Sequence, residues 1–187
     1  MQKRVPKKRE KEVIDVLVKM IGGQVGLQKK KDALREYVEG NQAAFYRLAF
    51  SYTKNSEAAL DVVQEAILKA IDKIGSLREP AYLKTWFYRI LVNESLTYLR
   101  GNQKLALVGD FSPECAVPDN CENIAEAIDT YNAVQALEPK IRTVIILRYF
   151  EDMTLEEIAR VTGANVNTVK SRLYKGLELL KISISEE

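Results

Sequence analysis

The residues best suited to chemistry with a ligand lie close together near the C-terminus, and all are polar or basic. They are Asn165, Asn167, Thr168, Lys170, Ser171, Arg172 and Lys175. Between them, Val166, Val169, Leu173 and Leu177 recur at helical spacing, and no acidic residue appears before Glu178. Asn, Ser and Thr suit base edges, whereas Lys and Arg suit phosphates and guanine. The segment predicts a helix with an inward apolar face and an outward face that fits DNA; a solvated basic face is the alternative.

The preceding segment carries the signals of a first helix and a tight turn. Thr154 and Glu157 form a capping-box pattern, which satisfies two backbone amides reciprocally. The apolar face of this helix consists of Ile158, Ala159 and Val161. Gly163 favours the left-handed conformation that ends a helix, and Asn165 is a suitable N-cap for the next helix. Together these features predict a helix-turn-helix whose second helix enters the DNA major groove.

The composition argues against several classes of enzyme. The 187 residues include no histidine, so the commonest general base and the commonest metal ligand are missing. This argues against Ser-His-Asp or Cys-His catalysis and against a Cys₂His₂ zinc site, and we expect no metal and no cofactor. Cys115 and Cys121 could form a disulfide loop, a redox switch or half of a metal site. Plain reduced thiols are favoured, because nothing else in the sequence indicates secretion.

The charges are unevenly distributed, although the net charge is only +2. Residues 1–35 hold eleven Lys/Arg and four Asp/Glu, whereas residues 105–138 hold no Lys/Arg and seven Asp/Glu. This asymmetry indicates separate modules joined by an acidic connector. The apolar run Val13–Ile21 is too short for a membrane span and is interrupted by Asp15 and Lys19. We therefore expect a cytoplasmic protein with no direct membrane insertion.

The hydrophobic periodicity is helical almost throughout, and no useful strand pattern occurs. Gly22, Gly23 and Gly26 are expected to break the chain after a short helix. Further helices are expected at residues 57–74 and 82–100, and again within 129–183. The fold class is therefore all-α, with two small helical domains joined by a flexible acidic linker. The expected parts are a basic N-terminal extension at 1–32, a first domain at 33–103, a linker at 104–128 and a second domain at 129–187.

Three segments, taken in order, resemble one known family. The segment LEPKIRTVIILRYFEDMTLEEIARVTGANVNTVKSRLYKGLELL, residues 137–180, resembles region 4 of bacterial sigma factors. DVVQEAILKAI, residues 61–71, resembles region 2.2, and LKTWFYRILVNESLTYLR, residues 83–100, resembles regions 2.3 and 2.4. Two such regions on a short linker resemble the extracytoplasmic-function (ECF) group of the sigma-70 family, and within it the sigma-V-like branch. The resemblance implies that the first domain binds core RNA polymerase and opens the −10 element, while the second reads the −35 element as duplex.

Residues 61–71 have two interpretations. Asp61, Gln64, Glu65 and Leu68 share one helical face. On residue types alone this is an ordinary solvated face, on which Glu65 and Lys69 form an i,i+4 pair. The resemblance implies instead that Asp61, Gln64 and Glu65 contact the β′ clamp helices of core polymerase.

The resemblance also assigns residues to −10 recognition and strand opening. They are Arg78, Tyr82, Trp86, Tyr88, Arg89, Asn93, Thr97 and Arg100. The last four form a polar stripe at helical spacing, while Trp86 and Tyr88 offer surfaces for unstacked bases, although core packing is the more frequent role of such aromatics. The loop at residues 75–84, with Arg78 and Tyr82, resembles the family segment that holds a base flipped out of the non-template strand.

The implied function is that of an alternative sigma factor, which is not an enzyme. The implied partners are core RNA polymerase, through its β′ clamp helices and β flap, promoter DNA, and a membrane-anchored anti-sigma factor. The alternative is a helix-turn-helix regulator that binds duplex operator DNA without acting as a polymerase subunit. A helical phosphotransfer or nuclease enzyme is disfavoured, because the sequence lacks histidine and a clustered carboxylate site.

Overall fold

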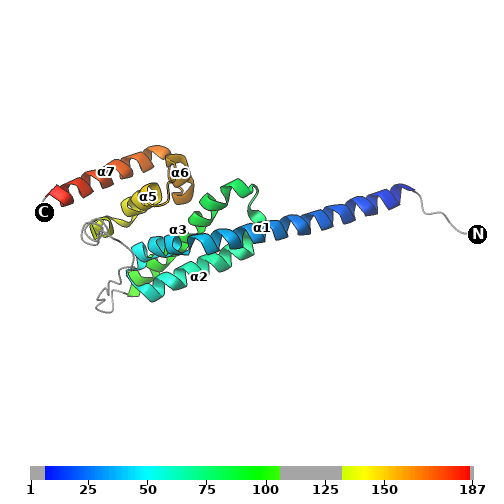
Figure 1. Ribbon diagram of the computed structural model, residues 1–187, viewed down its shortest axis with the longest axis horizontal. Helices are drawn as coiled ribbons and strands as arrows, with labels where there is room; N and C mark the ends of the chain where they lie inside the picture. Colours follow the sequence, from blue (N-terminus) through cyan, green and yellow to red (C-terminus); the bar gives the residue numbers. More distant parts are fainter. Residues whose placement is uncertain (1–6, 106–131, 186–187) are drawn as a thin grey trace, which may run out of the picture.

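The computed structural model describes residues 7–105 and 132–185, with side chains for 26–101 and 132–181. In these ranges all regular structure is helical, which confirms the expected all-α fold class. Two helical bundles lie against each other, and one long helix extends away from them (Figure 1). Cys115, Cys121 and nearly all of the expected linker lie outside the described residues. Within the described ranges, no helix combines the length and apolar character needed to cross a membrane.

The first bundle packs three helices around an aromatic core. They are α1 (Lys7–Thr53), α2 (Ser56–Lys73) and α3 (Leu83–Leu105). Asn55 caps α2 by accepting a hydrogen bond from the Ala58 amide, which fixes the start of this helix. The ring of Phe45 on α1 lies 4.4 Å from that of Phe87 on α3, and both side chains are fully buried. The contact of these rings ties α1 to α3.

α1 is longer than the sequence predicts. The expected break at Gly22, Gly23 and Gly26 was wrong, because α1 runs through all three glycines and deviates from helical geometry only at Asn41, whose φ is −128°. A glycine costs a helix only about 1 kcal/mol relative to alanine, and helix-forming residues flank this segment on both sides. The N-terminal half of α1 projects beyond the bundle as a single rod (Figure 1).

Two short 3₁₀ turns connect α2 to α3. They are η1 (Ile74–Ser76) and η2 (Pro80–Tyr82). Ile74 and Leu77 are buried, whereas residues 78–82 are exposed. The connection is therefore fixed to the core at its first residues and presents the rest to solvent.

The second bundle contains α5 (Pro139–Tyr149), α6 (Leu155–Thr162) and α7 (Val166–Ser185), and residues 132–136 are helical as well. α5 begins at Pro139, where a missing amide hydrogen is harmless. Val169 and Leu173 on α7 are buried as expected, but Leu177 is 37% exposed, which corrects the expectation for that residue. Gly176, one residue earlier, occupies the buried face, where Ile141 and Ile145 of α5 approach it too closely for a side chain.

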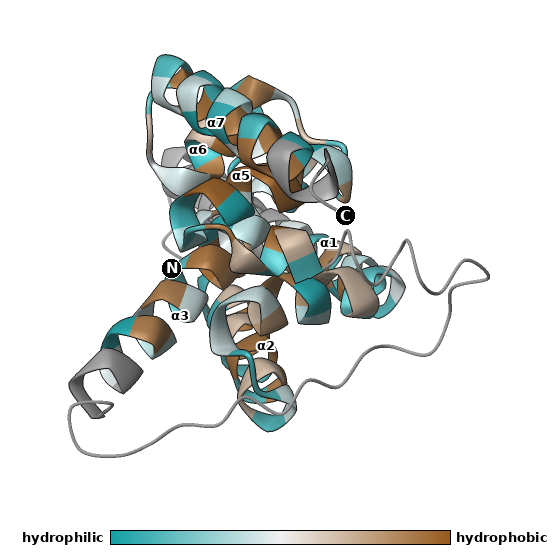
Figure 2. Cartoon of the chain, turned by 90° about the vertical axis from the view of Figure 1, so that its left-hand side faces the viewer, coloured by the Kyte–Doolittle hydropathy of each residue, from teal (hydrophilic) through white to brown (hydrophobic). Residues whose placement is uncertain are grey.

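The two bundles are in direct contact. α3 packs against α6, and α1 packs against α5. Figure 2, turned by 90° from Figure 1, shows α5, α6 and α7 grouped on one side, with α2 and α3 on the other. The helix-turn-helix is therefore held against the first bundle in this arrangement.

Candidate nucleic-acid interface

Local sequence signals build the helix-turn-helix. The Thr154 hydroxyl accepts a hydrogen bond from the Glu157 amide, and the Glu157 carboxylate accepts one from the Thr154 amide, so the predicted capping box is confirmed. Gly163 ends α6 in the left-handed conformation, with a φ of 66°. The Asn165 side chain accepts a hydrogen bond from the Thr168 amide at 2.7 Å and caps the start of α7. Each of these contacts spans three residues or fewer.

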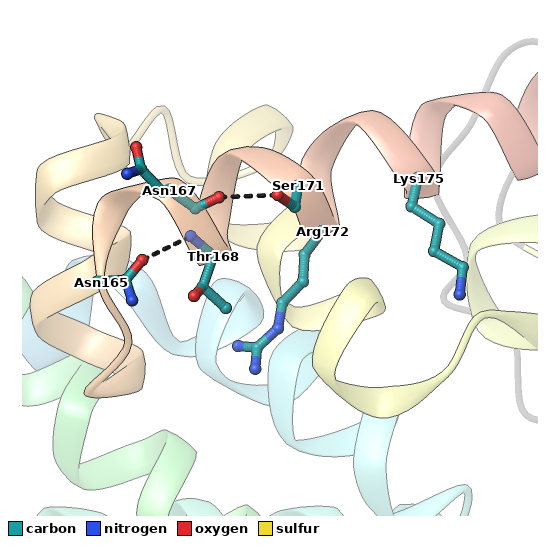
Figure 3. A pocket seen from close by; sticks show the side chains of 6 residues that line it. All are labelled: Asn165, Asn167, Thr168, Ser171, Arg172 and Lys175. Atoms are coloured by element: carbon teal, nitrogen blue, oxygen red, sulfur yellow. Dashed lines mark hydrogen bonds between the residues drawn. The ribbon is translucent and has the colours of Figure 1, made fainter.

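The first turns of α7 present an open hollow of about 430 Å³. Its lining consists of Asn165, Asn167, Thr168, Ser171, Arg172 and Lys175. Figure 3 shows the amide and hydroxyl groups at the helix start and the two basic side chains farther along it. Lys170 is exposed but does not line the hollow. The structure thus brings six of the seven predicted residues to one surface with hydrogen-bonding groups at one end and cations at the other.

The polar stripe on α3 has the expected exposure. Arg89, Asn93, Thr97 and Arg100 are all exposed on this helix. Within the stripe, the Thr97 hydroxyl donates to the Asn93 carbonyl at 2.8 Å, a bond that leaves the Asn93 side chain available to a ligand. The two arginines flank the neutral side chains, an arrangement that suits a strand whose phosphates lie at both ends of the contact.

The loop before α3 brings a second part of the predicted site to the surface. Arg78 is exposed, and Tyr82 is 52% exposed. The guanidinium of Arg160 on α6 lies over the Tyr82 ring, 5.5 Å from its centroid. Trp86 is only partly buried and packs against the core. A base that stacked on the same face of the Tyr82 ring would have to displace the Arg160 side chain.

Tyr88 is not available to DNA in this arrangement. Its side chain is fully buried, and its hydroxyl donates a hydrogen bond to the Glu151 carboxylate. Burial, followed by the hydrogen bond to Glu151 and the charge of that residue, raises the pKa of the Tyr88 phenol well above its usual range. The expectation that Tyr88 offers a stacking surface is therefore corrected: the ring packs against Phe45, and the hydroxyl reaches across to the second bundle.

The predicted polymerase face on α2 is exposed and has an apolar component. Asp61, Gln64 and Glu65 are all exposed. Leu60, Leu68 and Ile71 lie among them with 51%, 62% and 48% of their surface exposed. Only Leu68 was predicted to lie here; the i, i+8 and i+11 spacing of the three apolar residues was the signal that would have revealed the other two. The Glu65 carboxylate forms an ion pair with Lys69, with 3.2 Å between Oε1 and Nζ.

A buried glutamate connects the two bundles, and sequence reasoning missed it. Glu151, between α5 and α6, is only 7% exposed. Its carboxylate accepts hydrogen bonds from Arg47 of α1, at 3.1 Å, and from Tyr88 of α3, while its backbone carbonyl accepts one from Lys84. A charged group excluded from water is stable only when partners replace its solvent. Both donors to the carboxylate come from the first bundle, as does Lys84, which binds the backbone carbonyl.

Three further contacts join the C-terminal end of α1, or the residue that follows it, to the second bundle. Buried Arg142 of α5 donates hydrogen bonds to the carbonyls of Leu137 and Ser51. The hydroxyls of Tyr52 and Thr143 form a hydrogen bond with each other. Lys54 donates to the Gln135 carbonyl. No sequence signal could have indicated these pairs, because the partners from the two bundles are 91, 91 and 81 residues apart in the chain.

The part of the chain with described side chains offers no candidate metal centre. Within it, no group of three or more His, Cys, Asp or Glu side chains lies close enough to hold an ion. The exposed residues of the two bundles offer cations, hydrogen-bonding side chains and aromatic faces to a ligand.

Known proteins match both bundles. Residues 37–105 match Sigma-70 region 2, and residues 128–180 match Sigma-70, region 4. RNA polymerase sigma factor SigV of Bacillus subtilis is 42% identical over 160 residues, which cover 86% of this chain and 96% of that protein. ECF RNA polymerase sigma factor SigW of the same organism is 27% identical over 168 residues and covers 81% of this chain and 88% of its own length.

A solved structure has the same fold. The sigma factor RpoE of Bartonella quintana, crystallised with the anti-sigma factor NepR, superimposes with a TM-score of 0.70 at 25% identity, over 81% of this chain and 96% of that one. The first bundle is thus a sigma-70 region 2, and the second is a sigma-70 region 4. From its two matched regions and its extensive identity to SigV, the chain belongs to the ECF group of the sigma-70 family of RNA polymerase sigma factors.

Proposed function

We propose that this chain is an alternative sigma factor that binds core RNA polymerase and directs it to specific promoters, and that it is not itself an enzyme. The observation that carries the proposal is the presence of three different exposed surfaces on one chain. These are the hydrogen-bonding and basic hollow of α7, the polar stripe of α3 and the mixed acidic and apolar face of α2. A protein that bound only duplex DNA would need only the first.

The α7 surface reads the −35 element as duplex. Its proposed contacts are Asn165, Asn167, Thr168, Lys170, Ser171, Arg172 and Lys175. The N-terminal end of the second helix of a helix-turn-helix meets base edges in the major groove. Arg172 and Lys175 lie farther along α7, where they bind phosphates or guanine and make the binding salt-dependent.

The α3 stripe and the preceding loop read the −10 element while the strands separate. Arg89, Asn93, Thr97 and Arg100 bind the non-template strand along α3. Arg78 and Tyr82, with Trp86 beside them, accept a base that leaves the stack. Extruding a base costs a few kcal/mol, and a shaped pocket offsets this cost only for the preferred base. Tyr88 is left out of this set because it is buried against Glu151.

The α2 face binds core polymerase. Asp61, Gln64 and Glu65 supply the polar contacts to the β′ clamp helices. Leu60 and Leu68 supply apolar surface, because more than half of each side chain is exposed to solvent. Apolar residues inside a charged rim are typical of the centre of a protein interface. The second domain contacts the β flap, so that both regions are tied to one enzyme and each contact raises the effective concentration of the other.

An anti-sigma factor is the proposed regulatory partner. The support is the similarity to RpoE of Bartonella quintana, whose structure contains the anti-sigma factor NepR. By resemblance to the family, the partner of this chain is anchored in the membrane, while the chain itself acts in the cytoplasm with polymerase and DNA.

Transcription in vitro from genomic DNA tests the proposal. Purified protein and core polymerase are incubated with fragmented genomic DNA, and transcript starts are mapped by sequencing. We expect a small set of starts that share upstream sequence, and we expect them to disappear with Arg172→Ala or Asp61→Ala. Lys73→Ala, exposed but away from these surfaces, serves as the control and should leave the starts intact.

The same reagents distinguish the alternative regulator. A regulator binds duplex operator DNA tightly without polymerase, whereas a sigma factor needs core polymerase for specific binding. Tight binding to one duplex sequence by the protein alone, together with the absence of specific starts, would show that the proposed function is wrong.

A further inference from the structure

The segment of α1 that precedes the sigma-70 region 2 match packs against the loop between α2 and α3. The match begins at residue 37, but α1 continues toward the N-terminus from there. Leu34 is buried in the core at 2% exposure. One turn earlier, the Lys30 ammonium donates a hydrogen bond to the Leu77 carbonyl at 2.6 Å. One further turn away, Leu27 lies 3.9 Å from the position that a Cβ of Gly75 would occupy.

The Leu77 peptide is the point where this loop leaves the core. Residues 77–79 have no regular structure and separate η1 from η2. The Leu77 side chain is 4% exposed, and its amide donates to the Ile74 carbonyl at 3.1 Å. Beyond it, residues 78–82 are exposed. The Leu77 carbonyl is therefore the last anchored group before the residues proposed to hold a flipped base, and the side chain that anchors it comes from another helix.

The bond from Lys30 is stronger than an ordinary loop contact. Its donor is charged, and charge-assisted hydrogen bonds are roughly twice as strong as neutral ones. The contact is partly buried, which limits competition from water. A buried carbonyl that loses its partner also incurs the cost of remaining unpaired. Without the Lys30 ammonium, the Leu77 peptide could therefore change its orientation, and the position of residues 78–82 would be less well fixed.

We propose that Lys30 is a positioning residue for −10 recognition: by holding the Leu77 carbonyl, it fixes the loop that carries Arg78 and Tyr82 relative to α3. This inference rests on the proposed function of that loop. Lys30 does not touch DNA; it acts through the backbone of Leu77. A pocket discriminates among bases only when its walls are held within fractions of an ångström, and its supporting contacts decide that precision.

The sequence supplies matched controls on both sides of Lys30. Lys29 and Lys31 are exposed neighbours in the same helix, whereas Lys30 is partly buried. Replacing each of the three by methionine removes one positive charge from the same region and retains a long unbranched side chain. Only Lys30→Met removes the bond to Leu77, so charge loss and anchor loss are separated.

The experiment uses full-length protein with core polymerase on one promoter found by start mapping, with its −10 positions randomised and its −35 element unchanged. Open complexes that resist a polyanionic competitor are collected and sequenced. We expect the wild type, Lys29→Met and Lys31→Met to enrich the same bases. Lys30→Met should lower enrichment of the preferred flipped base by about tenfold, the loss expected for one charge-assisted hydrogen bond, and Lys30→Arg should restore most of it.

The possible results separate this proposal from the one on which it rests. If the wild type itself enriches no base at the −10 positions, the proposed function of the loop fails. If the wild type is selective and Lys30→Met has the same selectivity, or loses activity equally on every library member, Lys30 is not a positioning residue. Should Lys30→Met fail to fold, Lys30→Leu, which also lacks a donor and favours a helix, replaces it under the same criteria.

Discussion

Gly176 lets two helices of the sigma-70 region 4 domain approach more closely than any side chain would permit. A Cβ at this position would lie 2.9 Å from Cγ2 of Ile141 and 2.9 Å from Cγ1 of Ile145, both on α5. Protein interiors are close-packed, so neither isoleucine can move aside without disturbing its own neighbours. The absence of a side chain at one residue thus sets the distance between α5 and the helix that carries the polar and basic hollow.

We therefore predict that Gly176→Ala destabilises the protein, although alanine is the better helix former. The overpacking should lower the free energy of unfolding by about 1–3 kcal/mol, measured by urea unfolding followed by circular dichroism. Gly101→Ala is the matched control, because this helical glycine has no neighbouring atom within 4 Å of an added Cβ. It should raise stability by roughly 0.5–1 kcal/mol. A Gly176→Ala protein as stable as the wild type would contradict the close approach of the helices.

At the scale of the elements, helix ends were predictable where a side chain a few residues away determines them. Thr154, Gly163 and Asn165 were assigned to their caps from sequence, and the structure confirms each one. The continuity of α1 was not predictable, because a glycine run weakens a helix without forbidding it. The burial of Tyr88 depends on Glu151, 63 residues away, and no periodicity reports such a pairing. The exposed stripe of α3 was found because it follows from helical spacing alone.

Asn165 has two roles that a single substitution can separate. Its side chain caps α7 and also lines the hollow that we propose meets the −35 element. Aspartate caps as well as asparagine, and its charge favours a helix N-terminus. Asn165→Asp should therefore unfold at the wild-type urea midpoint yet weaken transcription from −35-dependent promoters by repelling phosphates. Asn165→Ala should lose about 1 kcal/mol of stability. Full activity of Asn165→Asp would remove this residue from the proposed −35 contacts.

The apolar stripe on α2 makes a separate prediction for the polymerase interface. Leu68 is 62% exposed, so Leu68→Ala should change the unfolding free energy by no more than about 0.5 kcal/mol. In a complex with core polymerase the same truncation should weaken binding about tenfold, because burying a leucine contributes roughly 1.5–3 kcal/mol. Fluorescence titration of labelled protein with core polymerase measures the effect. Lys73→Ala, which lies off the stripe, should bind as the wild type does; equal affinity of Leu68→Ala would exclude this residue from the interface.

At the scale of the whole molecule, contacts between the two bundles involve several of the residues proposed to bind DNA. Arg160 of α6 covers the Tyr82 ring, and the hydroxyl of Tyr88 is bound to Glu151. Burial raises the pKa of the Tyr52 phenol on α1, whereas its hydrogen bond with Thr143 and the charges of Arg142 and Arg172, all from the second bundle, act in the opposite direction. In this arrangement the second bundle partly covers the loop that carries Tyr82, whereas the α2 face with Asp61 and Glu65 remains exposed.

Glu151 should determine how firmly the two bundles are held together. Glu151→Gln retains the shape of the side chain but removes the charge that receives the Arg47 and Tyr88 hydrogen bonds. Hydrogen bonds to a charged group contribute about 1.5–3 kcal/mol, so the contact should weaken by roughly that amount. Small-angle X-ray scattering of the free protein should then give a larger radius of gyration, while helical circular dichroism stays unchanged. Glu156→Gln, exposed in the first turn of α6, is the control and should scatter as the wild type does. Identical scattering curves for Glu151→Gln and the wild type would mean that the remaining contacts of α1 and α3 with the second bundle suffice without this charge.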